Sequence, residues 1–275
     1  MVVQHNLQAA NTNRQLGITT SAQAKSTEKL SSGYKINRAA DDAAGLSISE
    51  KMRSQIRGLN KASSNAQDGV SLVQTAEGAL NETHSILQRM NELATQAANG
   101  TNTTVDRSAI KAELDQLTSE IDRIQSTTQF NTMNLLDGTF SGTKNKMKLQ
   151  VGALSGQSID FSIANMCASK IGLKAALSVS TFTKAGSYMK SVQDAIEVVS
   201  KQRSAMGAIQ NRLEHTIANL DTTSENTQSA ESRIRDTDMA SEMVTYSKNN
   251  ILAQAGQSML AQANQSTQGV LSLLQ

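Results

Sequence analysis

The sequence predicts a mainly α-helical protein, in which a long antiparallel helical bundle with a small β-hairpin is accompanied by paired N- and C-terminal helices. Three observations support this fold class. The 275 residues include no proline, a residue that interrupts helices. Apolar residues recur over long stretches in alternate steps of three and four residues, as on one face of a helix. In one short region they alternate with polar residues instead, as in a β-strand.

The clearest helical pattern runs from Ile48 to Ala97, where two neighbouring apolar stripes predict a helix covered on more than one side. Gly58, Gly69 and Gly78 oppose a helix here, each by up to about 1 kcal/mol if exposed. We therefore interpret these glycines as points where another helix approaches closely.

A turn at Asn99 and Gly100 is expected to end this helix, with Gly100 in the left-handed conformation. Thr103 and Asp106 form a candidate capping box for the next helix. Its apolar positions are Ile110, Leu114, Leu117, Ile121 and Ile124. Because the link is short, the two helices should form an antiparallel hairpin.

Residues 137–163 change to an alternating pattern and predict a β-hairpin that turns at Ser155 and Gly156. Its apolar positions are Met147, Leu149, Val151, Ile159, Phe161 and Ile163. Residues 164–185 are expected to be irregular. The next helix has the most regular heptad of the chain, with Val192, Val199, Met206, Leu213 and Leu220 at every seventh position.

Both terminal stretches are amphipathic but polar, and each is too thin to bury a core alone. We expect them to stay mobile until neighbouring copies of the chain cover them, so that folding is coupled to binding.

Composition argues against several classes of function. The net charge is only +2, and the chain lacks the basic stripe typical of nucleic-acid binding. Cys167 is the single cysteine, which rules out an internal disulfide framework. It is expected to be a small buried side chain or a bystander thiol. No run of apolar residues is long enough for a membrane span. The first residues do not resemble a secretory signal, so export is expected to follow another route.

Enzyme and metal chemistry are also not expected, and no cofactor is predicted. His5, His84 and His215 do not form a His-Glu-x-x-His motif. Asp236 and Asp238 could bind a cation, but a solvated turn before the last helix explains them better.

The segment from Leu30 to Leu46, LSSGYKINRAADDAAGL, closely resembles the N-terminal signature of bacterial flagellins. Further similar motifs are QDGVS from Gln67, TAEGAL from Thr75, EIDRI from Glu120, TQFN from Thr128, QANQ from Gln262 and VLSLL from Val270. The resemblance covers roughly residues 1–165 and 185–275.

This resemblance implies a short flagellin. Residues 1–44 and 231–275 would form the inner filament tube and its spoke linkers, and residues 45–230 would form the helical rod domain without outer variable domains. The matching spoke motif is Asn37, Arg38, Asp41 and Asp42.

The function implied is that of a non-enzymatic structural subunit, exported unfolded and self-assembling into an extracellular helical tube for motility. Implied partners are further copies of the chain, an export chaperone, and the filament cap and hook-junction proteins; neither nucleic acid nor membrane is expected. The alternatives are a hook–filament junction protein and a secreted monomeric ligand or adhesin.

A further implied partner is the vertebrate Toll-like receptor for flagellin. The residues matching its binding motif are Gln88, Arg89, Leu93, Gln96 and Glu113. In an antiparallel hairpin centred near residue 101, Arg89 and Glu113 face each other and could share one exposed patch, with Leu93 as an apolar anchor. The same residues could instead make ordinary contacts between subunits.

The C-terminal apolar stripe is expected to be buried in the filament tube, and to bind the export chaperone before assembly. Its members are Leu252, Met259, Leu260, Val270, Leu271, Leu273 and Leu274. A helix lying on a membrane surface is the weakest alternative, because basic residues are nearly absent after Lys248.

Overall fold

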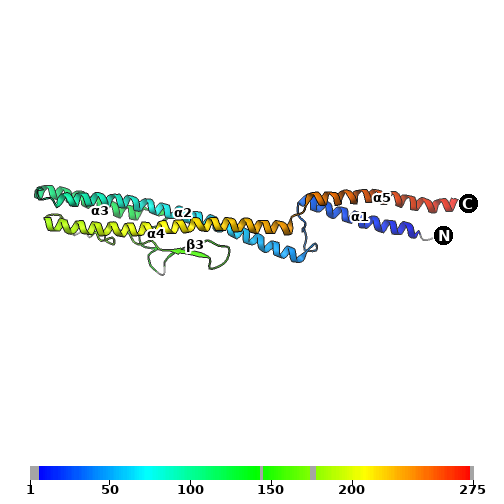
Figure 1. Cartoon of the computed structure of the whole chain (residues 1–275), viewed down its shortest axis with the longest axis horizontal. Coiled ribbons are helices and arrows are strands. Elements are labelled where there is room, and N and C mark those ends of the chain that lie inside the picture. Colours follow the sequence, from blue (N-terminus) through cyan, green and yellow to red (C-terminus); the bar gives the residue numbers. More distant parts are fainter. Residues whose placement is uncertain (1–5, 143–144, 174–177, 273–275) are drawn as a thin grey trace. The chain divides into compact units, whose positions relative to one another are not determined.

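The computed structural model describes residues 6–142, 145–173 and 178–272 (Figure 1). The helices are α1 (Leu7–Ser32), α2 (Ala43–Ala97), α3 (Thr104–Thr127), α4 (Phe182–Arg235) and α5 (Met239–Ser272). The strands are β1 (Gln129–Phe130), β2 (Met133–Asn134), β3 (Met147–Gln150) and β4 (Ser158–Phe161). The predicted mainly α fold with a small β-hairpin is confirmed.

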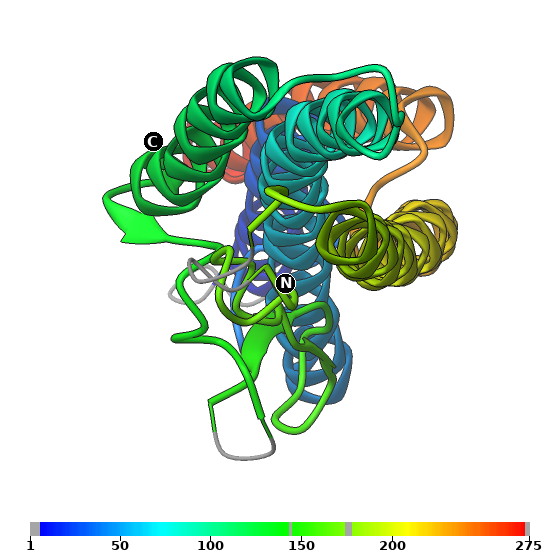
Figure 2. The ribbon, with the colours of Figure 1, turned by 90° about the vertical axis from the view of Figure 1, so that its left-hand side faces the viewer.

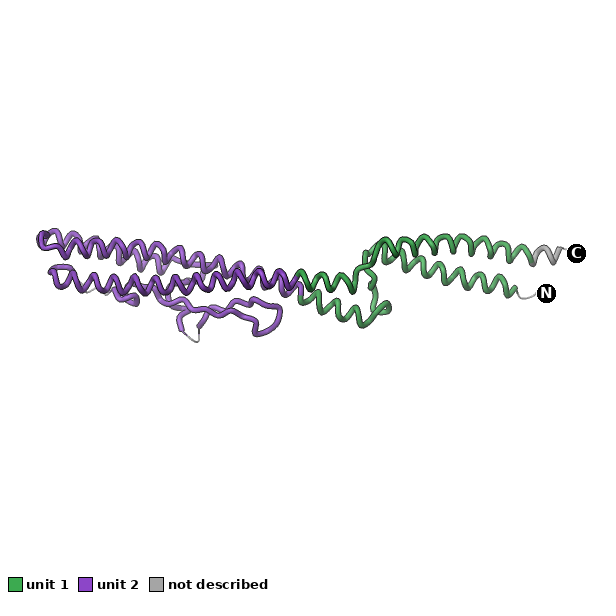
Figure 3. The backbone as a smooth tube through the Cα atoms, viewed as in Figure 1, with its two compact units in different colours: residues 1–55, 225–275 green, residues 56–224 purple. Residues whose placement is uncertain are grey.

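The chain divides into two compact units (Figure 3). Unit 1 comprises residues 1–55 and 225–275, and unit 2 comprises residues 56–224. Helices α2 and α4 contribute to both units. The predicted domains, with boundaries after residues 44 and 230, stay a prediction.

Unit 2 is built on α2, α3 and α4, which are seen end-on in Figure 2. Leu80 and Leu87 of α2 and Leu114 of α3 are among the fully buried side chains of its core. All five heptad residues of α4, from Val192 to Leu220, are buried as predicted. Apolar residues of the irregular segment before α4, such as Ile163, complete the same core.

Polar contacts set the register of the antiparallel pair α2 and α4. Ser63 Oγ donates to Asp221 Oδ1 at 2.9 Å, and Ser224 Oγ donates to Asn60 Oδ1 at 2.7 Å. These bonds lie beside a small apolar cluster that includes Leu59.

The connection between α2 and α3 confirms the predicted capping box of Thr103 and Asp106. The expected left-handed Gly100 is wrong, since Gly100 has no positive φ. The Arg107 side chain binds carbonyl groups at this end instead: it donates to the carbonyl of Ala97, the last residue of α2, and to that of Asn99 just beyond it. A left-handed glycine is not needed when side chains satisfy these acceptors.

The predicted β-hairpin is confirmed as the antiparallel pair β3 and β4, in which Met147 lies opposite Phe161. A second, smaller pair, β1 and β2, was not predicted. Its two-residue strands are too short to show a period, and its turn is made by Asn131 and Thr132, both with positive φ.

Two of the three α2 glycines mark close approaches, but mainly by the β-hairpin rather than by another helix. A Cβ at Gly58 would lie 2.8 Å from Ala153 Cβ and 3.2 Å from Ala153 Cα. A Cβ at Gly69 would overlap Leu149 Cδ1 of β3. Nothing lies within 4 Å of a Cβ at Gly78, so the predicted approach there is wrong.

We expect Gly58→Ala to lower the free energy of unfolding by about 1 kcal/mol. Overpacking against the Ala153 backbone costs about 1–3 kcal/mol, which exceeds the roughly 1 kcal/mol gained in helix propensity. Gly78→Ala is the matched control and should raise stability by about 1 kcal/mol, because its methyl group meets open space. Chemical denaturation followed by circular dichroism measures both, and equal effects of the two variants would contradict the close approach.

Candidate assembly and recognition surfaces

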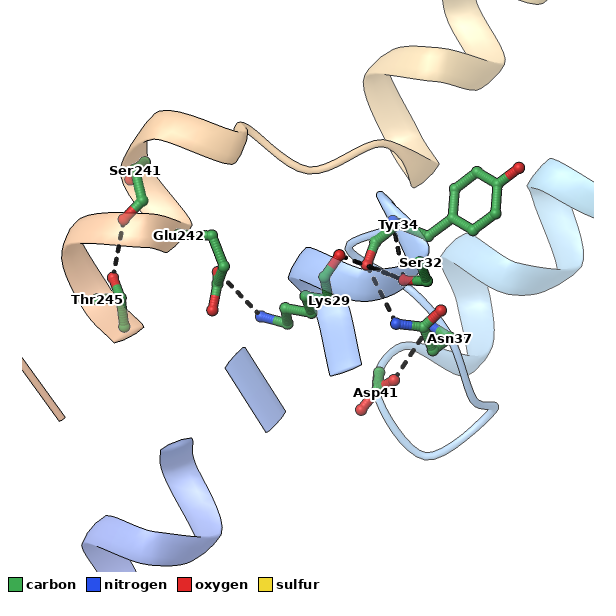
Figure 4. Close-up of polar contacts among 8 residues, drawn as sticks. All are labelled: Lys29, Ser32, Tyr34, Asn37, Asp41, Ser241, Glu242 and Thr245. Carbon is green, nitrogen blue, oxygen red and sulfur yellow. Dashed lines mark hydrogen bonds and ion pairs between the residues drawn. The ribbon is translucent and has the colours of Figure 1, made fainter. Parts of the chain in front are cut away.

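Helices α1 and α5 lie side by side and antiparallel within unit 1. Near one end, Asn6 Nδ2 donates to the Ala263 carbonyl at 3.0 Å. Near the other end, Lys29 Nζ and Glu242 Oε2 form an ion pair at 3.7 Å (Figure 4).

The contact between α1 and α5 buries small side chains. Among their described side chains, the buried ones are Ser26, Ala253 and Ala263. Side chains this small remove little apolar area from water, and a larger one at the contact, Leu16 beside Gly256, is only half-buried. The contact of the pair therefore leaves much of its apolar surface exposed.

Large apolar side chains of both helices remain exposed. Leu7 is 76% exposed, Val244 70% and Ile251 67%. Further exposed members are Ile18, Met239, Met243, Leu252 and Met259. Exposed apolar surface of this extent is typical of protein–protein contact sites.

The predicted C-terminal stripe is placed in part by the structure. Leu252 and Met259 are exposed on α5, and Leu260 is half-buried. Val270 and Leu271 belong to α5 but their side chains lie outside the described residues, as do Leu273 and Leu274 entirely.

The spoke motif forms one compact turn between α1 and α2. The Asp41 Oδ2 atom accepts from the main-chain amides of Arg38 at 3.0 Å and Asn37 at 3.2 Å. Asp42 Oδ1 accepts from the Gly45 amide at 2.8 Å and thereby caps the N-terminus of α2. All four motif residues therefore lie in the same turn, and Figure 4 shows Asn37 and Asp41 in contact.

The second connection, between α4 and α5, is short. Helix α4 continues to Arg235 and α5 begins at Met239, so residues 236–238 form the connection. Asp238 Oδ1 accepts from the amides of Ala240 at 3.0 Å and Ser241 at 3.2 Å, which makes it the cap of α5. The described residues hold no group of three or more potential metal ligands.

The predicted meeting of Arg89 and Glu113 across the α2–α3 hairpin is present. Arg89 Nη2 and Nε donate to Glu113 Oε1 at 3.0 and 3.2 Å, and Nη1 contacts Glu92 Oε2 at 3.3 Å. The bonds to Glu113 and then Glu92 raise the pKa of Arg89 above its ordinary value. Gln88 and Gln96 are exposed on the same helix.

Leu93 does not have the expected place in this patch. It is only 2% exposed and belongs to the core of unit 2. Because its side chain is packed in this core, Leu93 is no accessible anchor for a partner.

Two other features considered in the sequence, Cys167 and a membrane-bound helix, have no part in the surfaces described above. Cys167 is half-buried, with its Sγ 3.2 Å from Ser169 Oγ. Within the described ranges, no helix is both long and apolar enough to cross a membrane.

Long helices with a self-contained core in unit 2 and exposed apolar faces in unit 1 define a structural protein that associates with other chains. Comparison with known proteins agrees with this class. Residues 3–141 match the bacterial flagellin N-terminal helical region, and residues 189–274 match the C-terminal helical region.

Similar proteins are matched over their full length. A flagellin of Halalkalibacterium halodurans is 55% identical over 275 residues, and a flagellin of Bacillus subtilis is 50% identical over 303 residues; each comparison covers 100% of both chains. The crystal structure of Bacillus cereus flagellin aligns with a TM-score of 0.51 at 31% identity, covering 57% of this chain and 88% of that one.

The chain belongs to the bacterial flagellin family. It is a non-enzymatic structural subunit of the extracellular flagellar filament and functions in motility. A putative flagellar hook-associated protein of Vibrio parahaemolyticus shares the fold at 15% identity and a TM-score of 0.60, which is a likeness of fold alone.

The Asp41 carboxyl should titrate below the ordinary aspartate pKa of 3.8, because the amides of Arg38 and Asn37 stabilise its charged form. A pKa lowered by folding means that these bonds are present at neutral pH and are lost as the pH falls through the folded pKa. NMR titration of the carboxyl carbon, together with the Arg38 amide signal, measures this. A midpoint at or above 3.8 would contradict the hydrogen bonds.

Proposed function

We propose that the filament assembles by burying the exposed apolar faces of α1 and α5 against neighbouring copies, so that these helices form the wall of an inner tube. The observation that supports this is that the fully buried side chains of the α1–α5 pair are small, whereas many of its large apolar side chains are exposed. In this proposal the chain is exported unfolded, and its terminal segments become ordered on joining the filament.

The free energies are consistent with such a mechanism. Covering one side chain of the size of Ile251 or Met259 contributes about 1.5–3 kcal/mol. Several such side chains on each copy offset the entropy lost when two terminal helices become ordered. A separate chain lacks this contribution, which would keep its terminal helices marginal before assembly.

The same exposed face supports the export chaperone as a further partner. Leu252, Met259 and Leu260 lie on α5, and a chaperone groove covering them would prevent early polymerisation. Filament cap and hook-junction proteins would meet this face at the two ends of the filament.

Ile251→Asp should raise the critical concentration for filament growth about thirtyfold. The variant places a charge at the subunit contact and loses the roughly 2 kcal/mol that burial of the isoleucine side chain contributes. Gln257→Asp, at an exposed polar position of the same helix, is the matched control and should polymerise nearly as the unaltered chain does. Sedimentation of seeded filaments measures both.

Removal of residues 1–32 and 240–275 tests the proposal as a whole. The shortened chain should keep the helices of unit 2, which have their own core, and should form no filaments. Tubes seen by electron microscopy at the usual yield would refute the proposed role of α1 and α5.

A second candidate function is recognition by the Toll-like receptor for flagellin. It is supported by the Arg89 surface, which we define as Gln88, Arg89, Gln96 and Glu113. Glu113 and Glu92 hold the Arg89 guanidinium on the exposed side of the α2–α3 hairpin. An arginine held in one geometry loses less entropy on binding, which makes it a suitable anchor for a partner.

Arg89→Ala should weaken receptor binding about tenfold or more, as expected for an arginine anchor. Arg123→Ala removes the same charge from an exposed residue that is also paired with a glutamate, Glu120, and should leave binding within about twofold. Surface plasmon resonance with the monomeric chain separates the two. Equal losses would show that only net charge matters, and unchanged binding of Arg89→Ala would refute the surface.

A further inference from the structure

The two connections of unit 1 meet side by side directly after α1 and directly before α5. The Lys35 amide donates to the Arg235 carbonyl at 2.6 Å, and the Thr237 amide donates to the Gly33 carbonyl at 3.0 Å. Tyr34 and Asp236 form an isolated antiparallel bridge between these bonds. We call this set, residues 33–35 and 235–237, the crossing.

The crossing lies where α1 ends and α5 begins. Helix α1 stops at Gly33, whose φ of 75° is left-handed and whose amide donates to Lys29. Helix α5 begins just after Thr237, where Asp238 caps it. A shift of one connection relative to the other would therefore change the register between α1 and α5.

The Arg235 side chain holds the crossing together. Its Cζ lies 4.6 Å from the centre of the Tyr34 ring, and its Nη1 lies 3.5 Å from Glu50 Oε1 of α2. The side chain is only 13% exposed, while Glu50 is 54% exposed. Arg235 thus joins the end of α4 to the segment after α1 and to the first turns of α2.

The two contacts of the guanidinium differ in strength. A long ion pair to an exposed carboxylate contributes little, and Glu50 is also contacted by Arg53 Nη1 at 3.7 Å. A guanidinium over an aromatic ring is less affected by water, particularly when it is mostly buried. The Tyr34 ring is therefore the more important partner.

We propose that Arg235 is a positioning residue for assembly, which sets the register of α1 and α5 through its contact with the Tyr34 ring. This inference rests on the role proposed above for the two terminal helices. It adds that the Arg235–Tyr34 contact has to form before neighbouring copies can cover the apolar faces. If α1 shifted in register relative to α5, the exposed apolar side chains of the two helices would no longer be aligned.

Four variants of the full-length chain test this in seeded filament growth. Arg235→Ala and Tyr34→Leu should each slow elongation about tenfold, the effect of losing one partly buried cation–π contact. Tyr34→Phe keeps the ring and Arg53→Ala keeps Arg235, so both should elongate within about twofold of the unaltered chain. Hydrogen exchange of residues 33–37 in the resulting filaments should be faster in the first two variants only.

Thermal unfolding of the monomer separates positioning from general destabilisation, and should be unchanged in all four variants because unit 2 has its own core. Three results would overturn the proposal: normal elongation of Arg235→Ala, equal slowing by Arg53→Ala, or slower elongation that accompanies a lower melting temperature. Any of these leaves the role of α1 and α5 intact, since that role is decided separately by the chain lacking both terminal segments.

Discussion

The unequal burial of apolar side chains is the constraint on which the rest of this molecule depends. In unit 2, Leu80, Leu87 and Leu114 are enclosed by three helices of the same chain. In unit 1, the fully buried apolar side chains of α1 and α5 are small ones such as Ala253, while Ile251 remains exposed. One chain thus combines a folded core with an exposed apolar surface. A filament subunit of the proposed kind needs both, because unit 2 can fold alone while the apolar surface of unit 1 is covered only by neighbouring copies.

The polar residues serve to set register rather than to add much stability. The hydrogen bond from Ser63 to Asp221 joins α2 to α4, and the crossing at Arg235 joins the two connections of unit 1. A helical seam of alanine and leucine accepts several registers at similar free energy, because its hydrophobic stabilisation is not directional. Directional hydrogen bonds remove this ambiguity. In a protein that repeats its contacts along a filament, an error of register would be repeated in every subunit.

The Arg89 surface, which we propose as a receptor contact, lies on two helices whose other faces belong to the core of unit 2. Its side chains are exposed on the α2–α3 hairpin, yet they stand directly above core residues such as Leu93 and Met90. The helix that carries Arg89 is therefore fixed by packing in the core of unit 2. A charged surface on such a helix suits the receptor contact proposed above, since the partner does not have to order it on binding.

Local patterns in the sequence determined the helices, the heptad of α4, the capping box at Thr103 and the β3–β4 hairpin, because each depends on neighbouring residues and their period. The facing of Arg89 and Glu113 also followed from counting residues back from the turn. Only the tertiary structure decided which residues meet across long separations. It placed Leu93 inside the core, the hairpin rather than a helix against Gly58, and Arg235 over Tyr34. Such contacts join segments up to two hundred residues apart, and no local period records them.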